Sequence, residues 1–127
     1  MALPKILLVV PLVAAGIWLP AAGAAPKPAP AGSLGMDHEY FAKDQVTVKC
    51  GDTLSMVNDS RFVHIIGAGS GGSITSVPQG APITLYTMVE TNDIYTTGRW
   101  NVPGQYSLTC SVHPAMTVKV VVTDCCC

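Results

Sequence analysis

Charged side chains are scarce in this chain of 127 residues, which has seven Lys or Arg, eight Asp or Glu, and a formal net charge of −1. The basic residues form no stripe or cluster, so the electrostatic footprint of a nucleic-acid-binding protein is missing. So small a net charge also gives little long-range steering toward a charged partner. Nucleic acid is therefore not expected among the partners of this protein.

Catalytic patterns are missing as well. No Ser-His-Asp pattern and no pair of carboxylates stands out along the chain, so the sequence does not suggest an enzyme. The glycine-rich segment 67–72 lacks the Lys-Ser/Thr ending of a phosphate-binding loop. It predicts a flexible loop instead.

Helical patterning is the third absence, because no long stretch after residue 36 repeats apolar residues with a helical period. Short β-rich runs separated by turn residues take its place, which predicts an all-β sandwich or barrel. The strand candidates are residues 45–49, 53–58, 62–66, 83–89, 105–110 and 116–123.

The first 24 residues have the pattern of an export signal. Lys5 is the only charge in a short leading region, residues 6–18 are apolar, and Ala22-Gly23-Ala24 is a small-residue cleavage site. We predict cleavage after Ala24 and an extracytoplasmic location, whether periplasmic, cell-surface or secreted. The alternative is an uncleaved membrane anchor, because residues 6–25 come close to the ~20 residues that span a bilayer.

Residues 25–38 contain Pro26, Pro28 and Pro30 among Ala and Gly, which predicts an extended linker. The folded domain is expected over residues 39–127. A mature chain of this size can bury one modest core, so we expect a single domain and a monomer.

The most informative stretch is Cys110-Ser111-Val112-His113-Pro114-Ala115-Met116, which places a thiol, an imidazole and a thioether within seven residues. Thiolate and thioether ligands favour copper, and a Met at ligand spacing argues against zinc. One more imidazole would complete a Cys-His-His set with a weak axial Met, which describes a blue-copper electron-transfer site. His64 lies upstream in an apolar run and could supply that imidazole.

These residues resemble the small blue copper proteins, the cupredoxins, and most of all the plastocyanin and amicyanin group. The similarity runs from about Tyr40 to Asp124. It is carried by Val46-Thr47-Val48 before Gly51-Asp52-Thr53, by Asn58 with His64, by Pro103-Gly104-Gln105-Tyr106, and by the Cys-x-x-His-x-x-Met loop.

The resemblance implies a Greek-key β-sandwich of about eight strands with one type 1 copper ion at one end. It assigns the ligands as His64, Cys110, His113 and Met116. It also implies one-electron carriage between a redox donor and a redox acceptor, with the loop His as the exit for the electron. An uncharged stretch from residue 108 to residue 118 fits the apolar docking patch that surrounds this His in the family.

Each of these residues also has a purely structural interpretation. Cys110 could be buried or disulfide-bonded, His64 could be a core histidine, and Met116 could be simple core packing. Two departures from the family pattern are Ile65, where Asn is usual, and Val118, where Gly is frequent. Two other functions therefore stay open: an extracytoplasmic copper-binding or copper-delivery protein, and a metal-free interaction module with the same fold.

Four further cysteines are Cys50 and the terminal run Cys125-Cys126-Cys127. In the family that the chain resembles, the strand ending near Cys50 runs parallel to the last strand, so their ends should meet opposite the copper. We therefore expect Cys50 to bond one of the terminal cysteines, with Cys125 as the first choice. The other two could pair with each other, cross-link two chains or bind Cu(I).

Overall fold

The computed structural model describes residues 32–125, which form nine β-strands and no helix. The strands are β1 Gly32–Met36, β2 Gln45–Lys49, β3 Leu54–Asn58, β4 His64–Ser70, β5 Ser73–Ile74, β6 Thr87–Val89, β7 Ile94–Thr96, β8 Gly104–Cys110 and β9 His113–Thr123. This part of the chain holds no helix long and apolar enough to cross a membrane.

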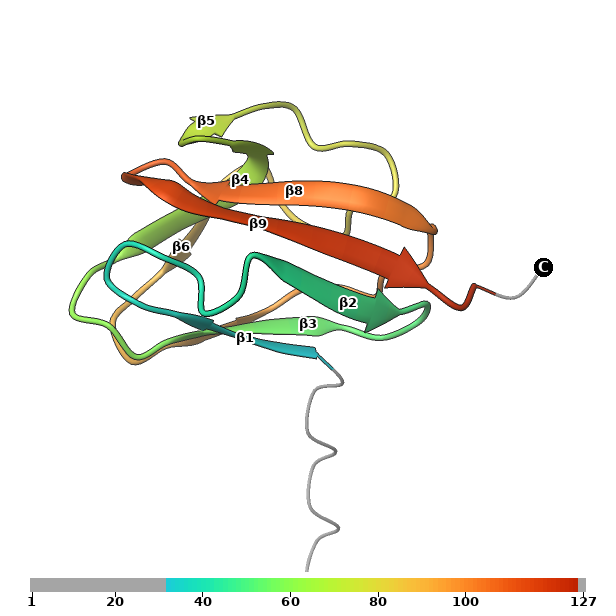
Figure 1. Cartoon of the computed structure of the whole chain (residues 1–127), viewed down its shortest axis with the longest axis horizontal. Helices are drawn as coiled ribbons and strands as arrows, with labels where there is room; N and C mark the ends of the chain where they lie inside the picture. Colours follow the sequence, from blue (N-terminus) through green and yellow to red (C-terminus); the bar gives the residue numbers. More distant parts are fainter. Residues whose placement is uncertain (1–31, 126–127) are drawn as a thin grey trace, which may run out of the picture.

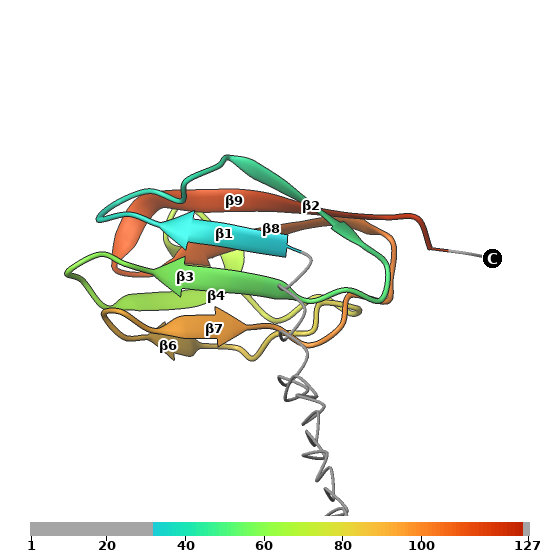
Figure 2. The ribbon, with the colours of Figure 1, turned by 90° about the horizontal axis from the view of Figure 1, so that it is seen from below.

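Two mixed sheets make up the domain (Figure 1). One has the strand order β1-β3-β7, and the other has the order β2-β9-β8-β4-β5, with β6 paired to β4. The second view, from below, shows β1, β3 and β7 lying side by side in one layer (Figure 2). The prediction of an all-β sandwich is confirmed.

Buried apolar side chains from both sheets fill the space between the layers. Trp100 is the largest fully buried side chain, and its ring lies edge-on to Tyr106 with 5.1 Å between centroids. Its indole N–H donates to the Thr97 hydroxyl at 2.9 Å, so the aromatic ring is buried without an unsatisfied donor. Trp100 and Tyr106 are core aromatics, and this core supports the sheet that carries the candidate site.

Strands β2 and β9 run parallel, in a register that pairs Val46 with Val120 and Val48 with Val122. The same direction brings Cys50, which follows β2, next to the end of β9, where its N–H donates to Thr123 O at 2.8 Å. Cys50 and Cys125 form a disulfide there, as predicted. Because β9 begins at His113 and ends at Thr123, this disulfide lies at the opposite end of the strand from the ligand loop (Figure 1).

The first strand corrects the predicted linker. Strand β1 lies within residues 25–38, pairs in parallel with β3, and fully buries Leu34 and Met36. The alternation of apolar and small residues from Gly32 to Met36 is a strand pattern of period two, which the preceding prolines obscured. Residues 1–31 and 126–127, with the predicted signal peptide and two of the terminal cysteines, lie outside the described residues.

The glycine run corrects a second prediction. Strand β4 continues through Gly67 to Ser70, and the loop is only the tight Gly71-Gly72 turn into β5. A Cβ on Gly67 would lie 2.6 Å from Leu85 O and 2.7 Å from an Ile74 methyl, so glycine permits close approach here.

The predicted strand over residues 83–89 shortens to β6, while β7, which the sequence did not suggest, pairs with β3. The Thr84 hydroxyl lies 3.1 Å from Tyr86 O and 2.7 Å from the Thr87 hydroxyl. These local bonds of a Thr side chain favour a turn over a sheet ladder.

Candidate metal centre

Three strands bring the predicted ligands to one end of the sandwich. His64 opens β4, Cys110 closes β8, and His113 opens β9. The ladder between β4 and β8 pairs Ile66 with Cys110, which places the start of β4 beside the end of β8. The ladder between β8 and β9 pairs Cys110 with His113 across a register shift. Strand pairing therefore joins His64 to residues almost fifty positions further along the chain.

The three side chains point their donor atoms at one another. The Nδ1 atoms of His64 and His113 are 3.2 Å apart, and each lies 3.7 Å from the Sγ of Cys110. A point equidistant from these three atoms lies about 2 Å from each of them, close to the ~2.0–2.3 Å of metal–nitrogen and metal–sulfur bonds in proteins. The geometry therefore fits a three-coordinate metal site, and the soft sulfur with two imidazoles suits copper.

Burial disfavours the charged form of the first histidine, His64. His64 and Cys110 are completely buried, and His113 is half-buried. Burial, and next the neighbouring His113, lower the pKa of His64 below the ordinary histidine value of 6.5. A neutral imidazole is the form that binds a metal ion, so the environment favours the ligand state of His64.

Met116 is fully buried on β9, three residues beyond His113. The structure brings His64, Cys110 and His113 together as one possible metal-binding group. The axial role of Met116 stays a prediction.

A Thr side chain and a glycine turn hold the ligand loop. The Thr109 hydroxyl, fully buried next to Cys110, donates to Met116 O at 2.9 Å and accepts the Gly72 N–H at 2.9 Å. Gly72 also packs directly on Pro114 of the loop. The β4–β5 hairpin therefore supports the ligand loop. From the sequence this segment was expected to be only a flexible loop.

Ser60 is a second residue that the sequence analysis missed. Its Oγ lies 3.1 Å from the Nε2 of His64, on the opposite side of the ring from the metal-facing Nδ1. Asn58, at the end of β3, bonds this hydroxyl through its Oδ1 at 2.7 Å. In the sequence, the only indication of this contact is that Ser60 precedes His64 by four residues. The turn of the chain between the two residues brings their side chains together.

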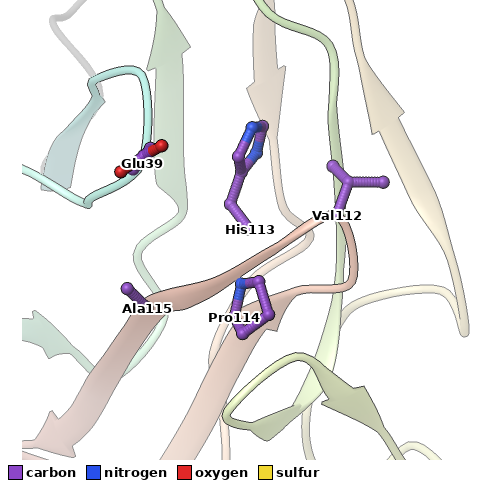
Figure 3. Close-up of a pocket in the computed structure, with 5 residues that line it drawn as sticks. All are labelled: Glu39, Val112, His113, Pro114 and Ala115. Atoms are coloured by element: carbon purple, nitrogen blue, oxygen red, sulfur yellow. The ribbon is translucent and has the colours of Figure 1, made fainter.

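The site reaches the surface beside His113. A shallow pocket of about 210 Å³ is lined by Glu39, Val112, His113, Pro114 and Ala115, and Figure 3 shows the His113 ring between Glu39 and Val112. The exposed Phe62 ring lies edge-on to His113 with 5.6 Å between centroids. One imidazole of the group is thus accessible from outside the protein.

No protein-family model matches this sequence. The chain is 32% identical over 106 residues to a curated protein named amicyanin-alpha from Methylorubrum extorquens, and the match covers 80% of this chain and 83% of that protein. Among solved structures, amicyanin from Paracoccus versutus is 25% identical with a TM-score of 0.58, covering 77% of this chain and 86% of that one. A Met-to-Ala mutant of amicyanin in the Cu(I) form gives a TM-score of 0.60 at 21% identity, covering 77% and 87%.

A two-sheet β-sandwich with a His-Cys-His group at one end defines the class of the cupredoxins, the small blue copper proteins. Within that class, the identity and coverage of the curated relative show that this chain belongs to the amicyanin family. Proteins of this family are type 1 copper electron carriers that exchange electrons with redox partners, and they are not enzymes. The predicted family and functional class are confirmed.

Proposed function

We propose that this protein binds one copper ion through His64, Cys110 and His113, with Met116 as a weak axial ligand, and carries single electrons. The observation that carries the proposal is the triangle of donor atoms, whose centre lies about 2 Å from two imidazole nitrogens and one sulfur. The donor set matches what a blue-copper site requires. When bound, copper would supply a one-electron Cu(I)/Cu(II) couple.

The protein's own contribution is to keep the ligands still. Cys110 and His113 flank a loop between two paired strands, and His64 enters from the neighbouring strand of the same sheet. Ligands placed on rigid elements hold their geometry more precisely than ligands on free loops. A site that changes little between its two oxidation states needs little reorganisation, which favours fast electron transfer.

The half-buried His113 is the proposed exit for the electron. Its ring lines the surface pocket together with Glu39 and three uncharged loop residues, while Cys110 is completely buried. A redox partner docked on this pocket would approach the metal through one imidazole. The partner is proposed to be an electron donor or acceptor protein.

We propose an extracytoplasmic location. The cleavage pattern at Ala22-Gly23-Ala24 supports it, and so does the Cys50–Cys125 disulfide, because disulfides persist in oxidising compartments. The protein is proposed to act there as a monomer.

Titration of metal-free protein with Cu(II) tests the function. We expect one equivalent to produce an intense blue colour from charge transfer between the Cys110 sulfur and copper, and reversible one-electron voltammetry. The variant Cys110→Ser should stay colourless. Rapid loss of copper to a competing chelator would favour delivery over electron carriage, and a colourless, copper-free wild type would favour a metal-free interaction module.

A further inference from the structure

A buried hydrogen-bond network lies beneath His64, on the side facing away from the other two donor atoms. Its members Asn58, Ser60 and His64 are at most 3% exposed. The network follows the end of β3 and connects the first ligand to the polypeptide between β3 and β4. We infer that Ser60 is a positioning residue that helps to fix which nitrogen of His64 is free to bind the metal, an inference that rests on the proposed copper site.

The first step is the orientation of the Asn58 amide. Its Nδ2 lies 2.8 Å from Phe62 O, 3.1 Å from Val89 O and 3.0 Å from Glu90 O. Its Oδ1 accepts the backbone N–H of Ser60 at 3.0 Å. The reversed amide would place its oxygen against three carbonyl oxygens and its NH₂ against an N–H donor. The surroundings therefore determine the positions of Nδ2 and Oδ1.

The second step is the direction of the Ser60 hydroxyl. Its Oγ lies 2.7 Å from Asn58 Oδ1, which can only accept, so the hydroxyl donates its single proton there. The alternative acceptor, Phe62 O, is further away at 3.2 Å and already accepts from Asn58 Nδ2. With its proton committed, the Ser60 oxygen can only accept at its other contacts.

The third step is the proton on His64. Because Ser60 Oγ accepts at this contact, the Nε2 of His64, 3.1 Å away, must be the donor. A neutral imidazole carries one N–H, so its Nδ1 holds a bare lone pair. That lone pair faces the Cys110 sulfur and the His113 Nδ1. Ser60 therefore presents the metal-binding nitrogen of His64 without a competing proton, as outer-shell partners of metal-bound histidines do.

The test measures the tautomer of His64 directly, by two-dimensional NMR of metal-free, full-length protein with nitrogen-15-labelled histidine at neutral pH. In the wild type we expect the Nε2–H form. In Ser60→Ala, the ratio of Nε2–H to Nδ1–H should fall at least about fivefold, the effect of losing one ordinary hydrogen bond. Ser60→Thr, which keeps the hydroxyl, should restore the ratio.

A matched control separates positioning from a general loss of stability. Ser55 is also buried, at 1% exposure, and its hydroxyl lies 2.7 Å from the Thr96 hydroxyl, away from His64. Ser55→Ala should therefore lower the thermal stability without changing the His64 tautomer. Copper affinity, measured with a competing chelator, should fall about tenfold or more in Ser60→Ala and stay at the wild-type value in Ser55→Ala.

If the wild-type protein holds His64 in the Nδ1–H form, that measurement alone overturns the inference. A Ser60→Ala protein that turns blue with unchanged tautomer ratio and copper affinity would overturn it as well, and would leave the proposed function intact. A wild type that binds no copper yet shows the Nε2–H tautomer would instead remove the proposed function and leave the assignment of the His64 proton standing.

Discussion

The Nδ1 atoms of His64 and His113 lie 3.2 Å apart, although 49 positions separate the two residues in the sequence. Two imidazole nitrogens this close cannot both carry a proton along the line that joins them. Both also face the Cys110 sulfur. The arrangement is suited to a single cation shared by all three atoms, and it makes protonation of His64 unfavourable.

The stability of the metal-free protein should therefore decrease at acidic pH. The pKa of His64 in the folded state lies below 6.5, because burial and His113 oppose its charged form. The unfolded chain takes up this proton near pH 6.5 while the folded chain does not, so the free energy of unfolding falls with pH below that value, by at most about 1.4 kcal/mol per pH unit. Urea denaturation at about pH 7.5 and about pH 5.5 measures the difference. In His64→Gln, the free energy of unfolding should decrease less between the two pH values. An equal decrease in both proteins would show that His64 is not the source of the pH dependence.

Substitution of Gly72 should disturb the ligand loop. Its φ is +85°, and an added Cβ would lie 3.1 Å from three atoms of Pro114. Gly72→Ala should lower the free energy of unfolding by about 1–3 kcal/mol and shift the absorption band of the copper-loaded protein, because Pro114 lies next to His113.

Gly71→Ala is the matched control for that substitution. Gly71 also has a positive φ, +60°, but an added Cβ there would meet no atom within 4 Å. This variant should carry only the backbone cost, about 1 kcal/mol, and leave the copper spectrum unchanged. Identical spectra for both variants would show that the hairpin does not support the loop.

Removal of the disulfide should weaken the fold and spare the metal centre. Cys50 and Cys125 close a loop of 75 positions, so Cys50→Ala should cost about 2–4 kcal/mol of unfolding free energy in denaturant titrations. The copper spectrum should not change, because the bond lies at the far end of β9.

Peptide mapping of the exported protein without reducing agent should find Cys50 oxidised. A free Cys50 thiol there would refute the pairing.

Substitution of Met116, the proposed axial ligand, should raise the reduction potential and preserve the colour. Met116→Leu keeps a buried apolar side chain of similar volume but removes the sulfur. A cupric ion loses more from the missing donor than a cuprous ion does, so the potential should rise by tens of millivolts, with about 59 mV for each tenfold change in relative affinity. Voltammetry measures it, and Met56→Leu, at another fully buried Met, is the control. Equal reduction potentials for both variants would show that Met116 only packs in the core and is not an axial ligand.

The sequence alone pointed to three of the four proposed ligands, because Cys110, His113 and Met116 lie close together and their chemistry depends on residue type and spacing. His64 was harder, because its connection to Cys110 arises from the pairing of β4 with β8. From the residues alone, His64 was only a candidate upstream in an apolar run, and the resemblance to a known family strengthened that link. The parallel pairing of β2 with β9, and with it the disulfide, came from the same source.

What the sequence could not show depends on contacts between distant segments. Glycine is a turn signal on its own, yet Gly67 lies inside β4. A glycine is required there because Leu85 O passes too close for any Cβ. Strand β1 follows a proline-rich segment and carries only two buried large side chains, Leu34 and Met36. The role inferred for Ser60 depends on the turn after β3, which brings its hydroxyl within 3.1 Å of the Nε2 of His64.

Electron–nuclear double resonance of the Cu(II)-loaded protein with nitrogen-15-labelled histidine tests the central claim most directly. If His64, Cys110 and His113 bind one cupric ion, the spectrum should show two strongly coupled imidazole nitrogens, together with the narrow copper hyperfine splitting that a covalent copper–sulfur bond produces. His64→Gly should remove one of the two nitrogen couplings. A single coupled imidazole in the wild type, or none, would contradict the account.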